Sequence, residues 1–225
     1  MAPASGIEGN AGREPSVLLA EGLAQLGLSL PPSAADALLR HAELVARWSR
    51  RVALTAHRGL DALIIKGTLD ALAWLPALPS AAGGRLIDIG SGAGFPGIPL
   101  ALARPDLGVT LLEASRRKAS LLAEAIRELG ITTAVAIQGR AEAAAWRPGH
   151  AGAYAVATSR AIAPADLLPG CLELLAPGGR FILSLAPRRG PVGGLPLLPE
   201  PWLARPFTAH PPFQLPRQLS VIEGG

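Results

Sequence analysis

Apolar positions in the first third of the chain repeat at helical spacing. They predict three helices, over residues 15–28, 31–54 and 60–75. The second opens on two prolines followed by Ser33, a residue type that often caps helices, so we expect Ser33 at its N-cap. Residues 15–80 are therefore expected to form a helical N-terminal portion. The small and polar residues 1–14 before it show no such pattern, and we expect them to be disordered.

Beyond residue 81 the pattern changes to short apolar runs that alternate with helical stretches. The runs predict buried strands over 85–89, 109–113, 133–138, 153–158 and 180–185. The stretches between them predict helices over 97–104, 115–129 and 164–176. This alternation is typical of an α/β fold with a mostly parallel sheet and helices on both faces. Two last runs, 202–209 and 217–223, predict a closing antiparallel pair that brings the sheet to seven strands.

Composition narrows the class of protein. The 225 residues are 49% hydrophobic, enough for one domain with a sizeable core. The lone Cys171 cannot form an intramolecular disulfide, and we expect it to be a buried apolar residue. The four histidines show no metal-ligand spacing, so no metal site is expected. We see neither a membrane-spanning run nor a signal peptide, and we expect a cytoplasmic protein without membrane contact.

The charge balance is mildly basic. Twenty-one basic and 17 acidic residues give a net charge of +4, which permits nucleic-acid binding without demonstrating it. All but two of the basic residues are arginines, which the codon bias of a GC-rich genome would also explain.

A glycine-rich stretch follows the first predicted strand, where that strand should pass into a helix. Gly90, Gly92 and Gly94 can adopt positive φ and let the backbone approach a ligand closely. In a parallel sheet such a turn lies at the carboxyl ends of the strands, where ligands bind. A tight turn without any ligand is the alternative.

Two acidic residues favour a particular ligand. Glu113 ends the second predicted strand, where a carboxylate can accept both hydroxyls of a ribose; a solvated strand-end charge is the alternative. Asp88 lies just before the glycines, and would repel a pyrophosphate but suits the amino group of a methionine moiety. The spacing D-x-G-x-G-x-G also differs from the dinucleotide pattern G-x-G-x-x-G. We therefore expect S-adenosylmethionine rather than NAD or FAD.

The stretch around these residues resembles a known family. Residues 86–122 are similar to the core motif of the RsmG (GidB) family, bacterial methyltransferases that use S-adenosylmethionine to modify N7 of a guanine in 16S ribosomal RNA. The stretch "GFPGIPL", 94–100, is more specific than generic methyltransferase glycines. Three further segments agree: "ARWSRRVALT" at 46–55, "TSRAIA" at 158–163 and "RQLSVIE" at 217–223.

The resemblance implies a Rossmann-like class I methyltransferase fold, with the cofactor-binding core over 81–225. It places cofactor contacts on Gly90, Phe95, Ala141, Glu142 and Arg160, beside Glu113 as the ribose ligand. It also implies 16S ribosomal RNA or the small ribosomal subunit as the partner, and we expect a monomer. The sequence departs from the family where Ala53 replaces an asparagine and Lys66-Gly67 replaces an arginine–histidine pair.

Methylation at guanine N7 requires no proton transfer by the protein's own side chains. N7 carries an in-plane lone pair and no proton, so catalysis reduces to positioning and we expect no catalytic residue. Because the product base is cationic, Arg160 should face the cofactor carboxylate or a phosphate rather than the base. Contacts to RNA phosphates are expected from five arginines: Arg47, Arg50, Arg51, Arg188 and Arg189.

Two other functions fit the same sequence. One is a diverged protein of methyltransferase fold that binds S-adenosylmethionine but acts on another substrate or on none. The other is a non-enzymatic RNA-binding protein that uses the basic helical portion.

Overall fold

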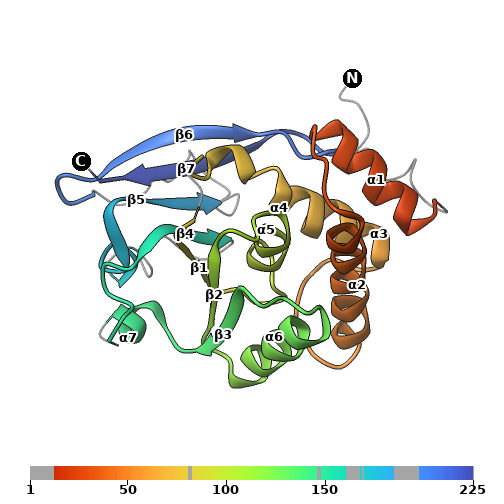
Figure 1. Cartoon of the computed structure of the whole chain (residues 1–225), viewed down its shortest axis with the longest axis horizontal. Helices are drawn as coiled ribbons and strands as arrows, with labels where there is room; N and C mark the ends of the chain where they lie inside the picture. Colours follow the sequence, from red (N-terminus) through yellow and green to blue (C-terminus); the bar gives the residue numbers. More distant parts are fainter. Residues whose placement is uncertain are drawn as a thin grey trace.

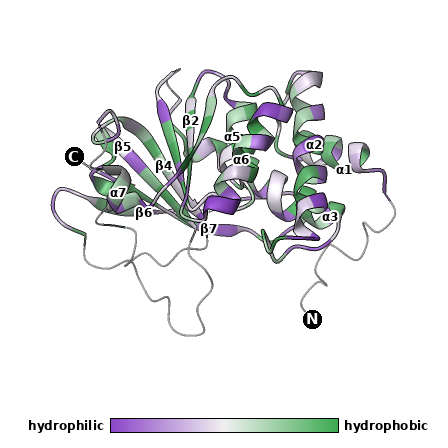
Figure 2. Cartoon of the chain, turned by 90° about the horizontal axis from the view of Figure 1, so that it is seen from below, coloured by the Kyte–Doolittle hydropathy of each residue, from purple (hydrophilic) through white to green (hydrophobic). Residues whose placement is uncertain are grey.

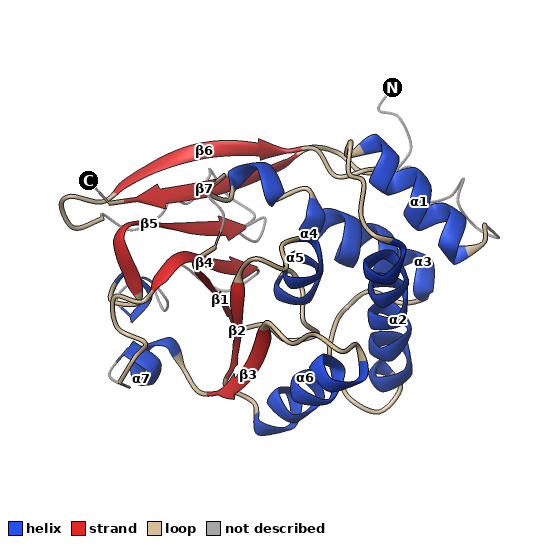
Figure 3. Cartoon of the chain, viewed as in Figure 1, coloured by secondary structure: helices blue, strands red, loops and turns tan. Residues whose placement is uncertain are grey.

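The protein is built around one seven-stranded sheet (Figures 1 and 3). The computed structural model describes residues 13–80, 83–145, 148–160, 168, 170–184 and 198–224. The strand order is β3-β2-β1-β4-β5-β7-β6. The strands are β1 Arg85–Ile89, β2 Gly108–Glu113, β3 Ala134–Gln138, β4 Tyr154–Arg160, β5 Leu175–Ser184, β6 Leu203–Ala209 and β7 Arg217–Glu223.

The pairing of the strands agrees with the apolar pattern. Strands β1 to β5 pair in parallel, and β7 pairs antiparallel with both β5 and β6. The predicted parallel sheet and its closing antiparallel pair are therefore confirmed. Strand β5 begins five residues earlier than expected, at Leu175 rather than 180. Its first part runs through Gly178, at φ 71°, and the register against β4 shifts between Tyr154 and Val156.

Two crossover helices lie close to their predicted positions, and a third, short one was not predicted. Helix α5 covers Gly97–Ala103, α6 covers Arg116–Glu128 and the short α7 covers Ala141–Ala145. Of the helix expected over 164–176, residues 164–167 and 169 lie outside the described residues, and residues 175–176 belong to β5 instead. Leu168, Cys171 and Leu174 are buried. Burial raises the pKa of the Cys171 thiol to about 12, in keeping with the expected apolar role.

The N-terminal portion is helical, but its third helix is interrupted. Helix α1 covers Pro15–Gln25 and α2 covers Pro32–Ser49. The predicted N-cap at Ser33 is wrong: Pro31 precedes α2 and Ser33 lies inside its first turn. The segment expected as one helix is divided into α3 Leu60–Leu63, the π-helical η1 Ile64–Leu69 and α4 Asp70–Leu72, followed by the 3-10 turn η2 Leu75–Ala77.

The N-terminal helices cover one face of the sheet together with α5 and α6 (Figure 1). Leu44 of α2 and the fully buried Trp74 belong to the same hydrophobic core as Leu86 and Val109 of the sheet. In Figure 2 green, hydrophobic stretches run along the strands and are interrupted by hydrophilic residues in purple. The helical portion thus shares its core with the sheet, and it brings the end of α2 and the loop to α3 toward the glycine turn. Among the described residues, no helix has the length and apolar character needed to cross a bilayer.

Candidate functional site

The glycine turn joins β1 to α5 at the carboxyl edge of the sheet. Gly90, Gly92 and Gly94 have φ values of 73°, 56° and 90°, which confirms the left-handed conformation expected for all three. At Gly92 a Cβ atom would have only two neighbours within 4 Å, the carbonyl oxygens of Gly90 at 3.7 Å and Leu54 at 4.0 Å. This side of the turn therefore offers open, backbone-lined space to a ligand.

Glu113 fixes the shape of the turn from the end of β2. Its Oε2 accepts a hydrogen bond of 2.9 Å from the backbone N–H of Gly92, and its Oε1 accepts one of 2.8 Å from Ser115. Glu113 is only 8% exposed. The alternative interpretation, a solvated charge at the end of the strand, is therefore wrong. A carboxylate has about four lone-pair positions, so two backbone donors leave room for the two hydroxyls of a ribose.

Asp88 lies beneath the turn rather than beside it. It is buried, and its two oxygens accept hydrogen bonds from Oγ1 of Thr158 at 3.0 Å and from the N–H of Gly97 at 3.2 Å. Burial raises the pKa of this carboxyl group to about 6, although the hydrogen bonds oppose the shift. Asp88 thus ties β1 to β4 and to the start of α5, and its contact with a methionine amino group stays a prediction.

Phe95 is buried between two elements of the N-terminal portion. Its ring centroid lies 4.7 Å from that of His41, on α2. A Cβ atom at Gly67 would lie 2.6 Å from Cζ of Phe95, so only glycine fits there without a shift of the ring. Phe95 therefore occupies the space that a side chain at position 67 would need. A contact of Phe95 with the cofactor stays a prediction.

His41 connects α2 with the glycine turn, and sequence reasoning missed it. Its Nε2 lies 2.9 Å from the carbonyl oxygen of Ala93. The side chain is fully buried, and burial lowers its pKa to about 4, so the ring is neutral at pH 7. The spacing of His41 on α2 is that of an ordinary core position, and its bond spans 52 residues, so no local signal marks it.

Ala141 and Glu142 open α7, beyond the end of β3. Glu113 and Gln138 are partners in the β2–β3 pair, so α7 begins near the Glu113 side of the same edge. Ala141 is buried and Glu142 is exposed. Their roles as cofactor contacts rest on the family resemblance and stay predictions.

Arg160 ends β4 and is held by a buried carboxylate. One of its terminal nitrogens lies 3.3 Å from Oδ2 of Asp70 and donates a hydrogen bond of 2.6 Å to the carbonyl oxygen of Lys66. Nε of Arg217 lies 2.6 Å from Oδ1 of Asp70. Asp70 itself has no exposed area, so one buried carboxylate joins the ends of β4 and β7 to the N-terminal helices.

The π-helical segment η1 explains part of this arrangement. A π-turn shifts the backbone hydrogen bonds from i+4 to i+5 and frees carbonyl oxygens for other donors. Lys66 accepts from Arg160, and Ile65 accepts a bond of 2.9 Å from Nε2 of Gln214. Sequence reasoning missed Asp70 and Arg217. An aspartate inside the apolar run 63–75 was the one available signal.

Two of the five expected RNA-binding arginines line a common hollow. Arg47 and Arg50 both face it from the end of α2. Arg51 follows them, and its backbone carbonyl accepts a hydrogen bond from Arg117 on α6. Arg188 and Arg189 lie outside the described residues. Among the residues that are described, no three His, Cys, Asp or Glu side chains are grouped so that they could hold a metal ion.

The site fits S-adenosylmethionine in the features that the structure describes. The turn leaves open space at Gly92, and Glu113 keeps acceptor capacity beside it. Arg160 brings a cation to the same edge at the end of β4. These are the groups expected to receive an adenosine ribose and a methionine carboxylate.

Comparison with known proteins identifies the family. The family model "GidB: rRNA small subunit methyltransferase G" matches residues 34–186. Over 193 residues the chain is 38% identical to the ribosomal RNA small subunit methyltransferase G of Ralstonia nicotianae, covering 82% of this chain and 83% of that protein. The chain belongs to this family. Its counterpart in Symbiobacterium thermophilum is 37% identical over 179 residues, 77% of this chain and 73% of the relative.

Solved structures show the same fold. A putative methyltransferase, yhhF, from Escherichia coli matches with a TM-score of 0.53 at 18% identity, over 69% of this chain and 83% of that one. A SAM dependent methyltransferase from Aquifex aeolicus matches with a TM-score of 0.51 at 12% identity, over 69% of this chain and 89% of that one. The Rossmann-like methyltransferase fold is therefore confirmed. The fold and the family membership together identify this GidB-family protein as an S-adenosylmethionine-dependent methyltransferase.

Proposed function

We propose that this GidB-family protein transfers the methyl group of S-adenosylmethionine to N7 of a guanine in 16S ribosomal RNA. The observation that supports this most is that the carboxylates at the site already accept hydrogen bonds from the protein. Asp88, Glu113 and Asp70 are each held by donors of the protein itself. A reaction that removes a proton needs a base with a free lone pair at the acceptor. N7 of guanine has no proton to remove, so it suits a site in which Asp70 and Asp88 are held by donors of the protein and the remaining acceptor capacity of Glu113 would be taken by the ribose.

The residues of the site would act by positioning. S-adenosylmethionine supplies an electrophilic methyl group on a sulfonium. Glu113 would accept the ribose hydroxyls, and the open side of Gly92 would let the backbone approach the same ligand closely. Together these contacts hold one reactant still, so that the RNA has only to present N7 in line with the methyl group.

Asp70 would reduce the repulsion between Arg160 and a cationic product. The methylated base carries a positive charge, and an unpaired guanidinium nearby would repel it. The carboxylate of Asp70 lies 3.3 Å from Arg160 and 2.6 Å from Arg217, so it offsets part of the charge of the two arginines. An anionic group of the cofactor or of the RNA bound to Arg160 would offset the positive charge that remains at this edge.

The names of the relatives support a ribosomal substrate. The two relatives described above are named for the small-subunit ribosomal RNA, and the end of α2 carries two of the five expected arginines, Arg47 and Arg50. We infer that the substrate is 16S ribosomal RNA, free or in the small subunit, and that the protein acts as a monomer in the cytoplasm.

The pH dependence of the chemical step tests the proposed reaction. His57 is half-buried near the site; burial lowers its pKa, and the charges of Arg160 and Lys66 lower it further. Single-turnover methyl transfer at saturating cofactor and RNA should be nearly flat between about pH 6 and 8.5. His57→Ala should change the rate less than about tenfold. A rate that rises with a pKa at or below 6.5 in the parent, and loses this dependence in His57→Ala, would indicate a general base and a different acceptor atom.

A further inference from the structure

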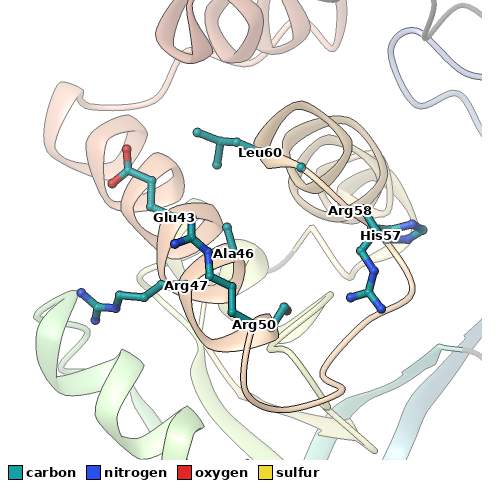
Figure 4. A pocket seen from close by; sticks show the side chains of 9 residues that line it. Glu43, Ala46, Arg47, Arg50, His57, Arg58 and Leu60 are labelled. Carbon is teal, nitrogen blue, oxygen red and sulfur yellow. The ribbon is translucent and has the colours of Figure 1, made fainter.

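A large hollow lies outside the glycine turn, between the end of α2 and the loop that leads into α3 (Figure 4). Its volume is about 730 Å³. One wall is the end of α2, with Glu43, Arg47 and the C-cap residue Arg50. The other wall is the loop with His57 and Arg58, together with Leu60 at the start of α3. A hollow of this size accommodates a ligand much larger than a single ion.

The charge of the hollow is strongly positive. Three guanidinium groups line it against one carboxylate, that of Glu43. Arg47 is partly engaged elsewhere, because its guanidinium lies 3.5 Å from Glu128 of α6. Within the described ranges, neither Arg50 nor Arg58 forms an ion pair with an acidic side chain. Both side chains are exposed, so their charges are available to a ligand.

Helix electrostatics account for two of the three arginines in the hollow. Arg47 and Arg50 lie at the carboxyl end of α2, where cations are stabilised by the helix dipole. Arg58 lies just before α3, at a helix start, where a cation has no such partner. Folding alone gives no reason to place Arg58 across a hollow from Arg50. A bound anion between the two would supply one.

The hollow adjoins the carboxyl edge of the sheet. His57 lines it, and the charges of Arg160, Lys66, Asp70 and Arg217 all act on this histidine. A nucleic-acid strand that presents a base to the site beside Arg160 would therefore run its backbone past His57 and into the hollow.

We propose that this hollow binds a backbone phosphate of single-stranded substrate RNA beside the target nucleotide, with Arg50 and Arg58 as its ligands from opposite walls. Leu60 contributes an apolar surface for the attached sugar or base. The proposal rests on the proposed function and adds to it a defined phosphate subsite, which includes Arg58 and excludes Arg51. Glu43 opposes binding there, since it is the one acidic side chain in the lining.

Binding of a fluorescein-labelled, single-stranded 20-nucleotide RNA, measured by anisotropy between 50 and 300 mM salt, tests the subsite. Arg50→Ala and Arg58→Ala should each weaken binding about three- to tenfold at 100 mM salt and flatten the salt slope by about 0.7. Arg205→Ala is the matched control, because the Arg205 side chain is 72% exposed on β6 and the substitution lowers the net charge by the same amount. It should change the affinity less than about 1.5-fold. Glu43→Gln should tighten binding, by about two- to fivefold.

The outcomes separate this proposal from its alternatives. If Arg50→Ala and Arg58→Ala bind RNA with the affinity and salt slope of Arg205→Ala, the hollow is no RNA site, even if it binds inorganic phosphate. If the variants methylate naked 16S ribosomal RNA normally and fail only on intact small subunits, the hollow serves a ribosomal protein and the proposal is wrong. A parent protein that binds RNA through the hollow but leaves guanine N7 unmodified would overturn the proposed function and not the subsite.

Discussion

The backbone N–H of Gly92 donates a hydrogen bond of 2.9 Å to Oε2 of Glu113, so the end of β2 holds the turn that follows β1. A second backbone donor, Ser115, fixes the other oxygen at 2.8 Å. The carboxylate that is expected to bind the ribose is thereby oriented before any ligand arrives. Such preorganisation lowers the cost of ordering a binding site.

Replacing Glu113 should therefore weaken cofactor binding. Glu113→Ala removes the charge-assisted acceptor for two ribose hydroxyls, and we expect a loss of about 1.5–3 kcal/mol in binding free energy. Calorimetric titration with S-adenosylmethionine measures this loss. Glu113→Gln keeps the size of the side chain and should lie between Ala and the parent. An unchanged dissociation constant in a folded Glu113→Ala protein would exclude the ribose role.

Gly92→Val should damage the turn itself. Gly92 has φ 56°, a conformation that costs a residue with a side chain about 1–2 kcal/mol, and a β-branched side chain would also project into the open ligand space. Gly108→Val is the control, since a Cβ atom there meets its nearest neighbours at an ordinary 3.9 Å. We expect cofactor affinity to fall more than tenfold in the first variant and to stay near the parent value in the second. Equal affinities would show that the turn tolerates any residue at position 92.

His41 should make stability depend on pH in a defined direction. Its folded pKa of about 4 lies below the ordinary value of 6.5, so the unfolded chain binds a proton that the folded protein excludes. The free energy of unfolding should therefore fall as the pH drops from 6.5 toward 4. Between pH 7 and pH 5 this contribution amounts to about 2 kcal/mol. His41→Gln keeps a donor for the carbonyl oxygen of Ala93 and should abolish this pH-dependent contribution. Urea denaturation at pH 7 and pH 5 measures the free energy of unfolding that checks it.

Asp88 acts in the opposite direction over part of the same range. Its folded pKa of about 6 lies above the ordinary 3.8, so its contribution to stability is present at low pH and lost as the pH rises through 6. The two effects partly cancel in the parent protein. Asp88→Asn should thus steepen the loss of stability on acidification, while His41→Gln reverses it. If both variants follow the pH dependence of the parent, neither buried group titrates as described.

Asp70 should be costly to replace, because it is buried and pairs with two arginines. Asp70→Asn leaves Arg160 and Arg217 without their carboxylate, and breaking a buried pair in this way costs about 3–5 kcal/mol. We expect a correspondingly lower unfolding midpoint in urea. Asp106→Asn is a suitable control, since its partner Arg104 is close to the surface and two residues away. A midpoint no lower than that of the control would show that Asp70 contributes little to the fold.

The sheet and the turn were predictable because their signals are local. Apolar runs mark buried strands, and glycines between a strand and a helix mark a turn that needs positive φ. The interruption of the third helix was not predictable in this way, because η1 depends on bonds to Arg160 and Gln214 from distant parts of the chain. The same holds for Asp70 and Arg217, which meet across 147 residues. The N-cap was misjudged because proline is favoured in the first helical turn, where its missing N–H has no cost.

The identity of the methylated atom tests the central claim most directly. Unmodified 16S ribosomal RNA, free or in small subunits, would be incubated with the protein and S-adenosylmethionine that carries a trideuterated methyl group, then digested to nucleosides for mass spectrometry. The account predicts deuterated 7-methylguanosine as the labelled product, with greatly reduced yield in Glu113→Ala. Label on an exocyclic nitrogen, on carbon or on a ribose hydroxyl would contradict it, as would RNA that stays unlabelled while the protein binds the cofactor.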